Sequence, residues 1–184
     1  MGTTWHKFWV HGLEAHVQNE PHPIATEAEL RPGYTYPNPR RNSQGTRVRQ
    51  NVGRNWFHFA IPTPIAMEPS THHEYHLEVK AVLLRGSGKN CRIKAVHVWS
   101  GGAGGGKKIC EYDVPRPRLL DGEFDEEYEF APYYHWEEPL AIDILVEFQE
   151  DGDITFGGAG VRFEAEVPAW VYAYPDAPCH PGGR

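Results

Sequence analysis

Three histidines lie on three predicted strand segments and could together bind a metal ion: His11, His58 and His97. Imidazoles that converge from neighbouring strands form a facial ligand set with an open coordination position, which suits zinc or iron. A metal held in this way could activate water or polarise a carbonyl group. The His-x-His pair and downstream Glu of a cupin metal site are missing, and strand histidines often donate to backbone carbonyls instead. We therefore predict at most one divalent metal as a cofactor, held by these three residues.

His97 and His58 are also the predicted catalytic residues, because an imidazole can donate and accept a proton near neutral pH. In this interpretation they lie in a small pocket whose apolar walls are Trp56, Trp99 and Tyr36. A cyclase, isomerase or hydratase acting on a small metabolite would suit such a pocket. The sequence contains neither a G-x-S-x-G elbow nor a catalytic cysteine signature, so it does not indicate nucleophilic catalysis.

Aromatic residues in two predicted loops could stack on a sugar or another flat ligand, with Arg or Glu side chains as hydrogen-bond partners. The alternative is that these rings anchor long loops onto the fold or line a contact between subunits. The predicted ligand-binding residues, from loops and strands together, are Trp56, Trp99, Tyr34, Tyr36, Arg54 and Trp136.

A predicted β-hairpin from residue 74 to residue 99 positions His97. Apolar and polar residues alternate from Glu74 to Lys80, which is the pattern of a strand with one buried face. Turn-forming residues follow at 85–90, and apolar residues alternate again from Cys91 to Trp99. This parity places His97 beside apolar neighbours, unless a bulge intervenes near Val96.

Other segments also show strand patterns. Residues 56–61 form a predicted strand that ends at Pro62, because proline cannot donate a hydrogen bond to a ladder. Residues 140–148 alternate between apolar and polar types, and Asp151-Gly152 is a typical two-residue hairpin turn. In the last strand the apolar parity changes across residues 157–160, which predicts a glycine bulge or a sharp bend.

The fold class follows from these patterns. The sequence has no long run of apolar residues at helical spacing. Its 184 residues include 16 prolines and 19 glycines, which interrupt helices. Several strands with glycine-marked bends and long loops predict an antiparallel, jelly-roll-like β-sandwich, with a closed β-barrel as the alternative. We expect one sandwich domain over residues 1–167 and a Pro/aromatic tail over residues 168–184.

The charge distribution suggests partners. A formal charge of −7 disfavours nucleic acid as a partner, since nucleic-acid binders normally carry a basic face. Opposite charges gather in two segments, which could form a contact between copies in a homo-oligomer or could simply be two solvated surfaces. The basic segment contains Arg31, Arg40, Arg41, Arg47, Arg49 and Arg54, and the acidic one contains Asp121, Glu123, Asp125, Glu126, Glu127 and Glu129.

The sequence also indicates a compartment. The first residues lack the apolar core of a signal peptide, and no apolar run is long enough to span a bilayer. The three cysteines have no C-x-x-C spacing and do not require an oxidising environment. We expect a cytoplasmic protein that does not interact with membranes.

Four pieces occur in a characteristic order and spacing: WVHG at 9–12, NWFHFAIPTP at 55–64, VHVWSG at 96–101 and ITFGGAGVRF at 154–163. In these pieces the chain resembles a family of small, uncharacterised, largely bacterial all-β proteins, a domain of unknown function. The resemblance covers about Trp5 to Glu166 and implies an all-β fold, but no catalytic residues. The glycine run after Ser100, the acidic segment around Asp125 and the tail beyond Pro168 are longer than the family pattern.

These observations lead to two hypotheses about function. The first is a non-catalytic binding or self-assembly module that presents aromatic and charged loops to a small molecule, a carbohydrate or another copy. The alternative is the small pocket enzyme built around His97 and His58, with or without a histidine-ligated metal.

Overall fold

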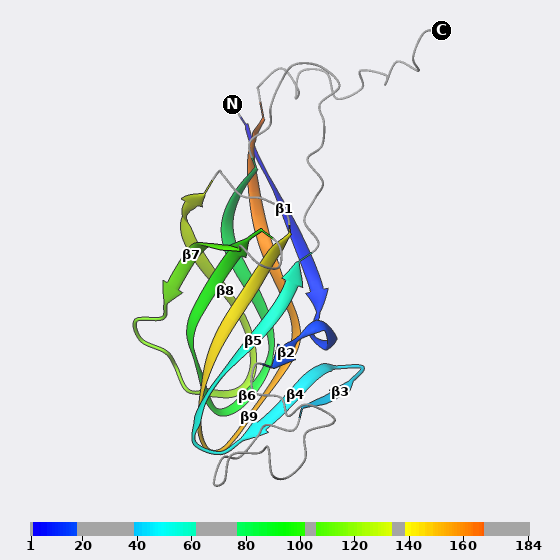
Figure 1. Ribbon diagram of the computed structural model, residues 1–184, viewed down its shortest axis with the longest axis vertical. Coiled ribbons are helices and arrows are strands. Elements are labelled where there is room, and N and C mark those ends of the chain that lie inside the picture. Colours follow the sequence, from blue (N-terminus) through cyan, green and yellow to red (C-terminus); the bar gives the residue numbers. More distant parts are fainter. Residues whose placement is uncertain (1, 18–38, 62–76, 102–105, 134–138, 168–184) are drawn as a thin grey trace, which may run out of the picture.

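The computed structural model describes residues 2–17, 39–61, 77–101, 106–133 and 139–167. Within these ranges the chain forms one curled, nine-stranded antiparallel sheet (Figure 1). Its strands are β1 (Gly2–His11), β2 (His16–Val17), β3 (Arg40–Asn42), β4 (Gly45–Gln50), β5 (Gly53–Ile61), β6 (Leu77–Ser100), β7 (Lys107–Asp113), β8 (Leu120–Tyr133) and β9 (Leu140–Val167). The short 3-10 helix η1 (Gly12–Glu14) follows β1. No helix in the described ranges is long and apolar enough to cross a membrane.

The two longest strands, β6 and β9, pair along their whole length and form the framework of the fold. Their register runs from Leu77 opposite Ala165 to Ser100 opposite Leu140. Both strands turn back at the lower end of the molecule, where Asn90 and Asp151 have positive φ angles of 51° and 54° (Figure 1). The paired strands are thereby folded over, and their two halves lie in two facing layers.

The remaining strands extend these two layers. The first layer contains β2, β5, residues 140–148 of β9, residues 91–100 of β6, and β7. The second layer contains residues 153–167 of β9, with β1 and the β3–β4 pair on one side, and residues 77–89 of β6 with β8 on the other. The predicted all-β antiparallel class is confirmed. In place of two separate sheets, the hydrogen bonding of β6 and β9 continues around the fold and joins the layers.

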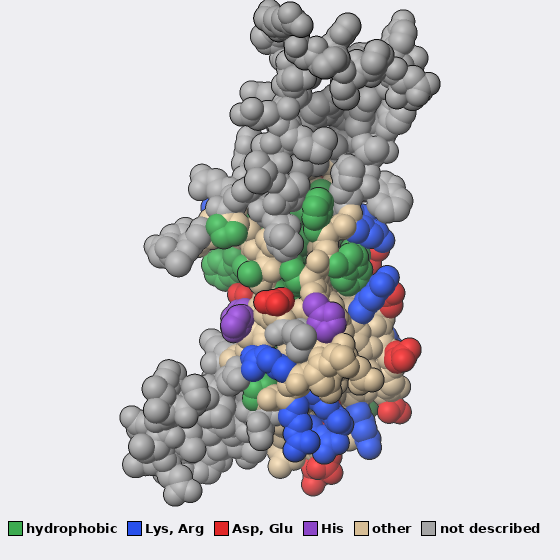
Figure 2. Space-filling model, turned by 90° about the vertical axis from the view of Figure 1, so that its right-hand side faces the viewer, with side chains coloured by type: hydrophobic (Ala, Val, Ile, Leu, Met, Phe, Trp, Pro, Cys, Tyr) green, Lys and Arg blue, Asp and Glu red, His purple; other side chains and the backbone are tan. Residues whose placement is uncertain are grey.

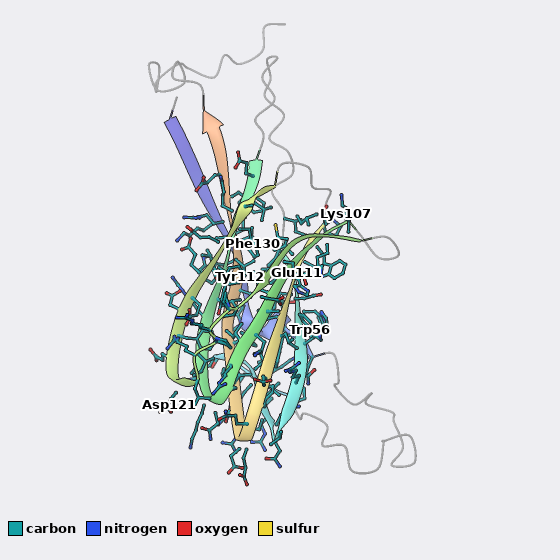
Figure 3. All side chains as sticks on the ribbon, turned by 90° about the vertical axis from the view of Figure 1, so that its left-hand side faces the viewer. Trp56, Lys107, Glu111, Tyr112, Asp121 and Phe130 are labelled. Atoms are coloured by element: carbon teal, nitrogen blue, oxygen red, sulfur yellow. The ribbon has the colours of Figure 1, made fainter. Side chains whose placement is uncertain are left out.

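Phenylalanines from both layers fill the core between them. The ring of Phe156 on β9 lies 4.9 Å from that of Phe57 and 5.5 Å from that of Phe59 on β5, between centroids. All three side chains are fully buried. At the margin formed by β7 and β8, the ring of Tyr112 packs against that of Phe130, with 6.2 Å between the ring centroids (Figure 3). Apolar contact therefore joins the layers where backbone hydrogen bonds do not.

The predicted β-hairpin at 74–99 is wrong in its pairing. The chain does reverse, at Asn90, but residues 77–89 pair with β8 and β9, and residues 91–100 pair with β7 and β9. The predicted turn at Asp151-Gly152 also reverses the chain, and its two arms likewise pair with β6. Each turn signal was recognised correctly, but the partner of each strand was not, because pairing depends on residues far away in the sequence.

A bulge in β6 reverses the predicted direction of His97. The register moves from Ile93 opposite Val146 to Ala95 opposite Leu145, so that Lys94 is skipped. The core-facing residues accordingly change parity, from Cys91 and Ile93 before the bulge to Val96 and Val98 after it. The prediction that His97 shares the core side is therefore wrong, and the cause is a bulge of the kind allowed for near Val96.

The predicted glycine bulge in β9 is confirmed. Arg85 pairs with Gly158 and the next residue of β6 pairs with Phe156, so Gly157 is the extra residue. A Cβ atom on Gly12 would lie 1.6 Å from the carbonyl oxygen of Phe156, and one on Gly45, whose φ is +128°, would lie 1.9 Å from the same oxygen. Glycine is required at both positions because two segments pass against the β9 backbone at this point.

Candidate functional site

An open groove lies on the outer face of the second layer, near the point where β6 and β9 turn back. Its volume is ≈ 910 Å³, and a smaller hollow of ≈ 340 Å³ adjoins it. The two share Gln44, Ser87 and Thr155, so we treat them as one site, called the groove below. Its other lining residues are Arg85, Gly86, Glu123, Phe124, Asp125, Gly157, Asn42, Arg47, Gly88, Lys89 and Asp153.

Strand alternation explains why these side chains are available. Ile154 and Phe156 point into the core, so Thr155 between them points outward. In the register Thr155 pairs with Ser87 of β6, and Ser87 pairs with Glu123 of β8. Three strands thus place one hydroxyl, a second hydroxyl and a carboxylate in a single row across the floor of the groove.

Ion pairs hold four of the charged lining residues. The Arg85 guanidinium donates to Asp125 at 3.1 Å, and it lies 4.5 Å from the centroid of the Trp9 ring. Such a cation–π contact at an exposed site contributes about 0.5–1 kcal/mol. At the other end Arg47 donates from Nε to both carboxylate oxygens of Asp153, each at 3.0 Å. The groove consequently carries charges of both signs that largely neutralise each other.

Asp153 is a carboxylate in the groove that accepts hydrogen bonds from two arginines. Burial raises the pKa of Asp153, but hydrogen bonds and positive charge from Arg47 and Arg49 outweigh burial and hold this pKa below its usual value. Arg49 donates to the same carboxylate at 2.9 Å. Asp153 is therefore ionised at neutral pH and orders two arginines of β4, which belong to the predicted basic segment. Figure 2 shows Lys and Arg side chains gathered at this lower end of the molecule.

A second cluster lies on the outer face of the first layer. The strand registers align one residue from each of five adjacent strands: His16, His58, Asp143, His97 and Glu111. We call this set the histidine–carboxylate row.

His58 is oriented by its acidic neighbour in this row. Its Nδ1 atom lies 2.6 Å from a carboxylate oxygen of Asp143. A carboxylate on one ring nitrogen fixes the imidazole and leaves the other nitrogen for proton transfer or for a ligand. His97 is the neighbour of Asp143 on its other side. The two predicted catalytic histidines therefore flank one carboxylate, two strands apart.

His97 is the more enclosed of the two, because its ring packs against Trp56 at 4.8 Å between centroids. Its Nε2 atom lies 3.3 Å from Glu111, and Figure 3 shows Trp56 and Glu111 along the same side of the molecule. Burial lowers the pKa of His97, and the positive charge of Lys108 acts in the same direction. Three carboxylates act the other way without reversing this shift: Glu111, Asp143 and Asp113. His97 is thus mainly neutral at neutral pH.

The remaining predicted site residues lie elsewhere. His11 lies on β1 in the second layer, opposite Gly158, so the predicted metal set of His11, His58 and His97 is divided between the two layers and is not assembled. Trp99 follows His97 outward on β6, and its indole nitrogen is buried with no hydrogen-bond partner among the described residues. Arg54 pairs with Glu147 on the exposed face of the first layer, with an N–O distance of 2.9 Å. Tyr34, Tyr36 and Trp136 lie outside the described residues.

Much of the predicted acidic segment is paired within the chain. On β8, Asp125 pairs with Arg85, and Glu126 accepts from Arg118 at 2.7 Å. Glu127 and Glu129 both pair with Arg162 of β9. These internal pairs reduce the charge left for a contact between copies, and the homo-oligomer stays a prediction.

Sequence reasoning missed two residues that shape these sites. Asp143 was visible only as an outward residue within an apolar strand, and its contact with His58 follows from the register of β5 and β9. Trp9 appeared as part of the WVHG piece, and its packing over Gly160 and Arg85 needs β1 to pair with β9. The glycines at 158 and 160 were the available signal, since an outward glycine leaves room for a ring from the next strand.

Neither a protein-family model nor a curated protein matches this chain. Among solved structures, the chain is similar to the enzymatically active domain of tailspike protein 4 of bacteriophage CBA120, with 13% identity and a TM-score of 0.34. The similarity covers 85% of this chain and 19% of that one, so the chain spans about a fifth of that structure's length. A TM-score this low carries no argument about function.

Proposed function

We propose that this chain is a non-catalytic binding module whose groove takes a neutral carbohydrate or a similarly hydroxyl-rich small molecule. The observation that carries the proposal is the lining of the groove, in which hydrogen-bond donors and acceptors lie among charges of both signs that balance one another.

The chemistry of the lining favours a ligand rich in hydroxyl groups. A sugar hydroxyl donates one hydrogen bond and accepts others, and the Ser87 and Thr155 hydroxyls do the same. The Gln44 amide also offers both functions, while Asp125 accepts and Arg85 donates. Vicinal hydroxyls can therefore find complementary partners in several orientations along the groove.

The electrostatics favour a neutral ligand over a polyanion. Arg85 is committed to Asp125, and Arg47 is committed to Asp153. The lining also contains Lys89 and Glu123, one charge of each sign, so the groove has no excess positive charge to attract a phosphate or sulfate group. A neutral sugar can bind the outer atoms of the pairs without breaking them.

Gly157 gives the ligand access to the backbone. A Cβ atom at this bulge would lie 3.6 Å from the carbonyl oxygens of Arg85 and Gln44, which is ordinary contact. Glycine is therefore not needed there for packing. Its missing side chain leaves the groove floor open, where a ligand hydroxyl can approach main-chain groups.

The test uses a panel of neutral mono- and disaccharides, including glucose, galactose, mannose, N-acetylglucosamine and lactose, in saturation-transfer NMR followed by calorimetry. At least one should bind, and the double variant Ser87→Ala/Thr155→Val should weaken it at least tenfold, because two hydrogen bonds contribute about 1–3 kcal/mol. The Arg54→Gln variant on the other layer is the matched control and should bind as the wild type does. Failure of every sugar to bind, or unchanged binding by the double variant, would disprove the proposal.

A further inference from the structure

Three metal-ligating side chains meet on the outer face of the first layer, away from the groove. They are His97 of β6 and Glu111 and Asp113 of β7, and their ligand atoms all lie within 4.8 Å of one another. His97 pairs with Glu111 in the register, and Ala95 pairs with Asp113. Glu111 and Asp113 are two residues apart, so both point to the face that carries His97.

The neighbours of this cluster hold the imidazole in place for a ligand. The Trp56 ring against His97 limits its rotation, and only 12% of the His97 side chain is exposed. Glu111, by contrast, is 49% exposed and can move toward an ion. The nitrogen donor is thus held in place, and the carboxylate oxygens beside it are accessible to an ion.

We propose that His97, Glu111 and Asp113 form a site for one divalent first-row transition metal, with water completing the coordination. Zinc binds histidine nitrogen at about 2.0–2.1 Å and carboxylate oxygen at about 2.0–2.2 Å, so ligand atoms that now lie within 4.8 Å of one another would close to about 3.4 Å around the ion. A nitrogen donor among oxygens favours Zn²⁺, Co²⁺ or Mn²⁺ over Ca²⁺ and Mg²⁺, which prefer oxygen ligands throughout. This site differs from the predicted set of three histidines and shares only His97 with it.

Lys108 is the natural competitor for this metal. Its Nζ atom lies 2.5 Å from the second carboxylate oxygen of Glu111, and its charge also acts on His97. A bound dication would repel this ammonium group and would have to displace it from Glu111. Removing the charge of Lys108 should therefore tighten metal binding, an effect that a surface histidine elsewhere would not produce.

The experiment titrates the full metal-free chain with Zn²⁺ in a calorimeter and with Co²⁺ in an absorption spectrometer. We expect one equivalent to bind, with visible Co²⁺ bands that report nitrogen and oxygen ligation. Asp113→Asn should weaken binding at least tenfold, and His97→Ala should abolish the bands. Lys108→Met should tighten binding at least threefold. Asp113→Asn alters an exposed side chain and should not affect folding, which a melting curve checks.

The controls separate this site from other histidines of the chain. His11→Ala, and the triple variant His72→Ala/His73→Ala/His76→Ala, should each bind as the wild type does. Loss of binding in either control, or equal binding by wild type, Asp113→Asn and Lys108→Met, would overturn the proposal and indicate an adventitious site. The groove variant Ser87→Ala/Thr155→Val should bind metal normally, so this proposal and the carbohydrate proposal can fail separately.

Discussion

At the scale of single residues, one carboxylate in each candidate site contacts basic side chains of a neighbouring strand and orients them. Asp143 orients His58 in the first layer, and Asp153 holds Arg47 and Arg49 in the second. Each carboxylate comes from β9, which pairs with strands on both of its sides. Acidic residues on this central strand therefore reach basic partners that lie far away in the sequence.

Asp153→Asn should lower the free energy of unfolding by about 1–2 kcal/mol at pH 7, because charge-assisted hydrogen bonds to a side chain only 16% exposed are lost. The pKa of Asp153 is lower in the folded state, so its stabilisation is complete above the unfolded value of about 3.9 and is lost as pH falls through the folded value. Urea unfolding at pH 7 and at pH 3 measures this. Asp125→Asn, which breaks an exposed pair, should change stability by at most about 0.5 kcal/mol. A pH-independent difference for Asp153→Asn would contradict this account.

At the scale of the strands, single-residue bulges decide which side chains point outward. The bulge at Lys94 turns His97 and Trp99 outward, and the bulge at Gly157 opens the floor of the groove. Because side chains alternate with a period of two, one extra residue exchanges the two faces of everything that follows. Both candidate sites therefore depend on a bulge.

Two glycines near the β9 bulge should differ in how strongly the same substitution affects stability. Gly12→Ala should destabilise the protein by more than about 2 kcal/mol, because the new Cβ atom would overlap the Phe156 carbonyl oxygen and the backbone would have to move. Gly157→Ala should change stability by less than about 1 kcal/mol, because its Cβ atom has normal contacts. Thermal unfolding of the two variants tests the contrast. Equal effects would mean that η1 does not lie against β9 as described.

At the scale of the whole molecule, we expect the two layers to unfold as one cooperative unit, since β6 and β9 belong to both and Phe156 packs between them. Phe156→Ala should therefore lower the free energy of unfolding by about 3–5 kcal/mol, as for other buried phenylalanines. Phe8→Ala, at a half-buried ring that packs on Phe163, is the matched control and should cost markedly less. Denaturation followed by tryptophan fluorescence and by circular dichroism should give coincident transitions. Two separate transitions would show that the layers unfold independently.

The sequence by itself determined the β class, the strands around Trp56–Ile61 and Leu140–Phe148, the two chain reversals and the glycine bulge in β9. These features are local, because the alternation of apolar residues and the conformational freedom of glycine are readable within a few neighbouring positions. It also selected His58 and His97 as candidate site residues, by residue type alone.

Only the tertiary structure decided which strands pair, in which register, and on which face each histidine lies. The alignment of His58, Asp143, His97 and Glu111 requires β5, β9, β6 and β7 to pair at one particular offset, and these strands come from distant parts of the chain. The groove likewise combines a turn near Gln44 with residues of β6, β8 and β9. Register depends on the packing of all these segments at once, so no local pattern contains it.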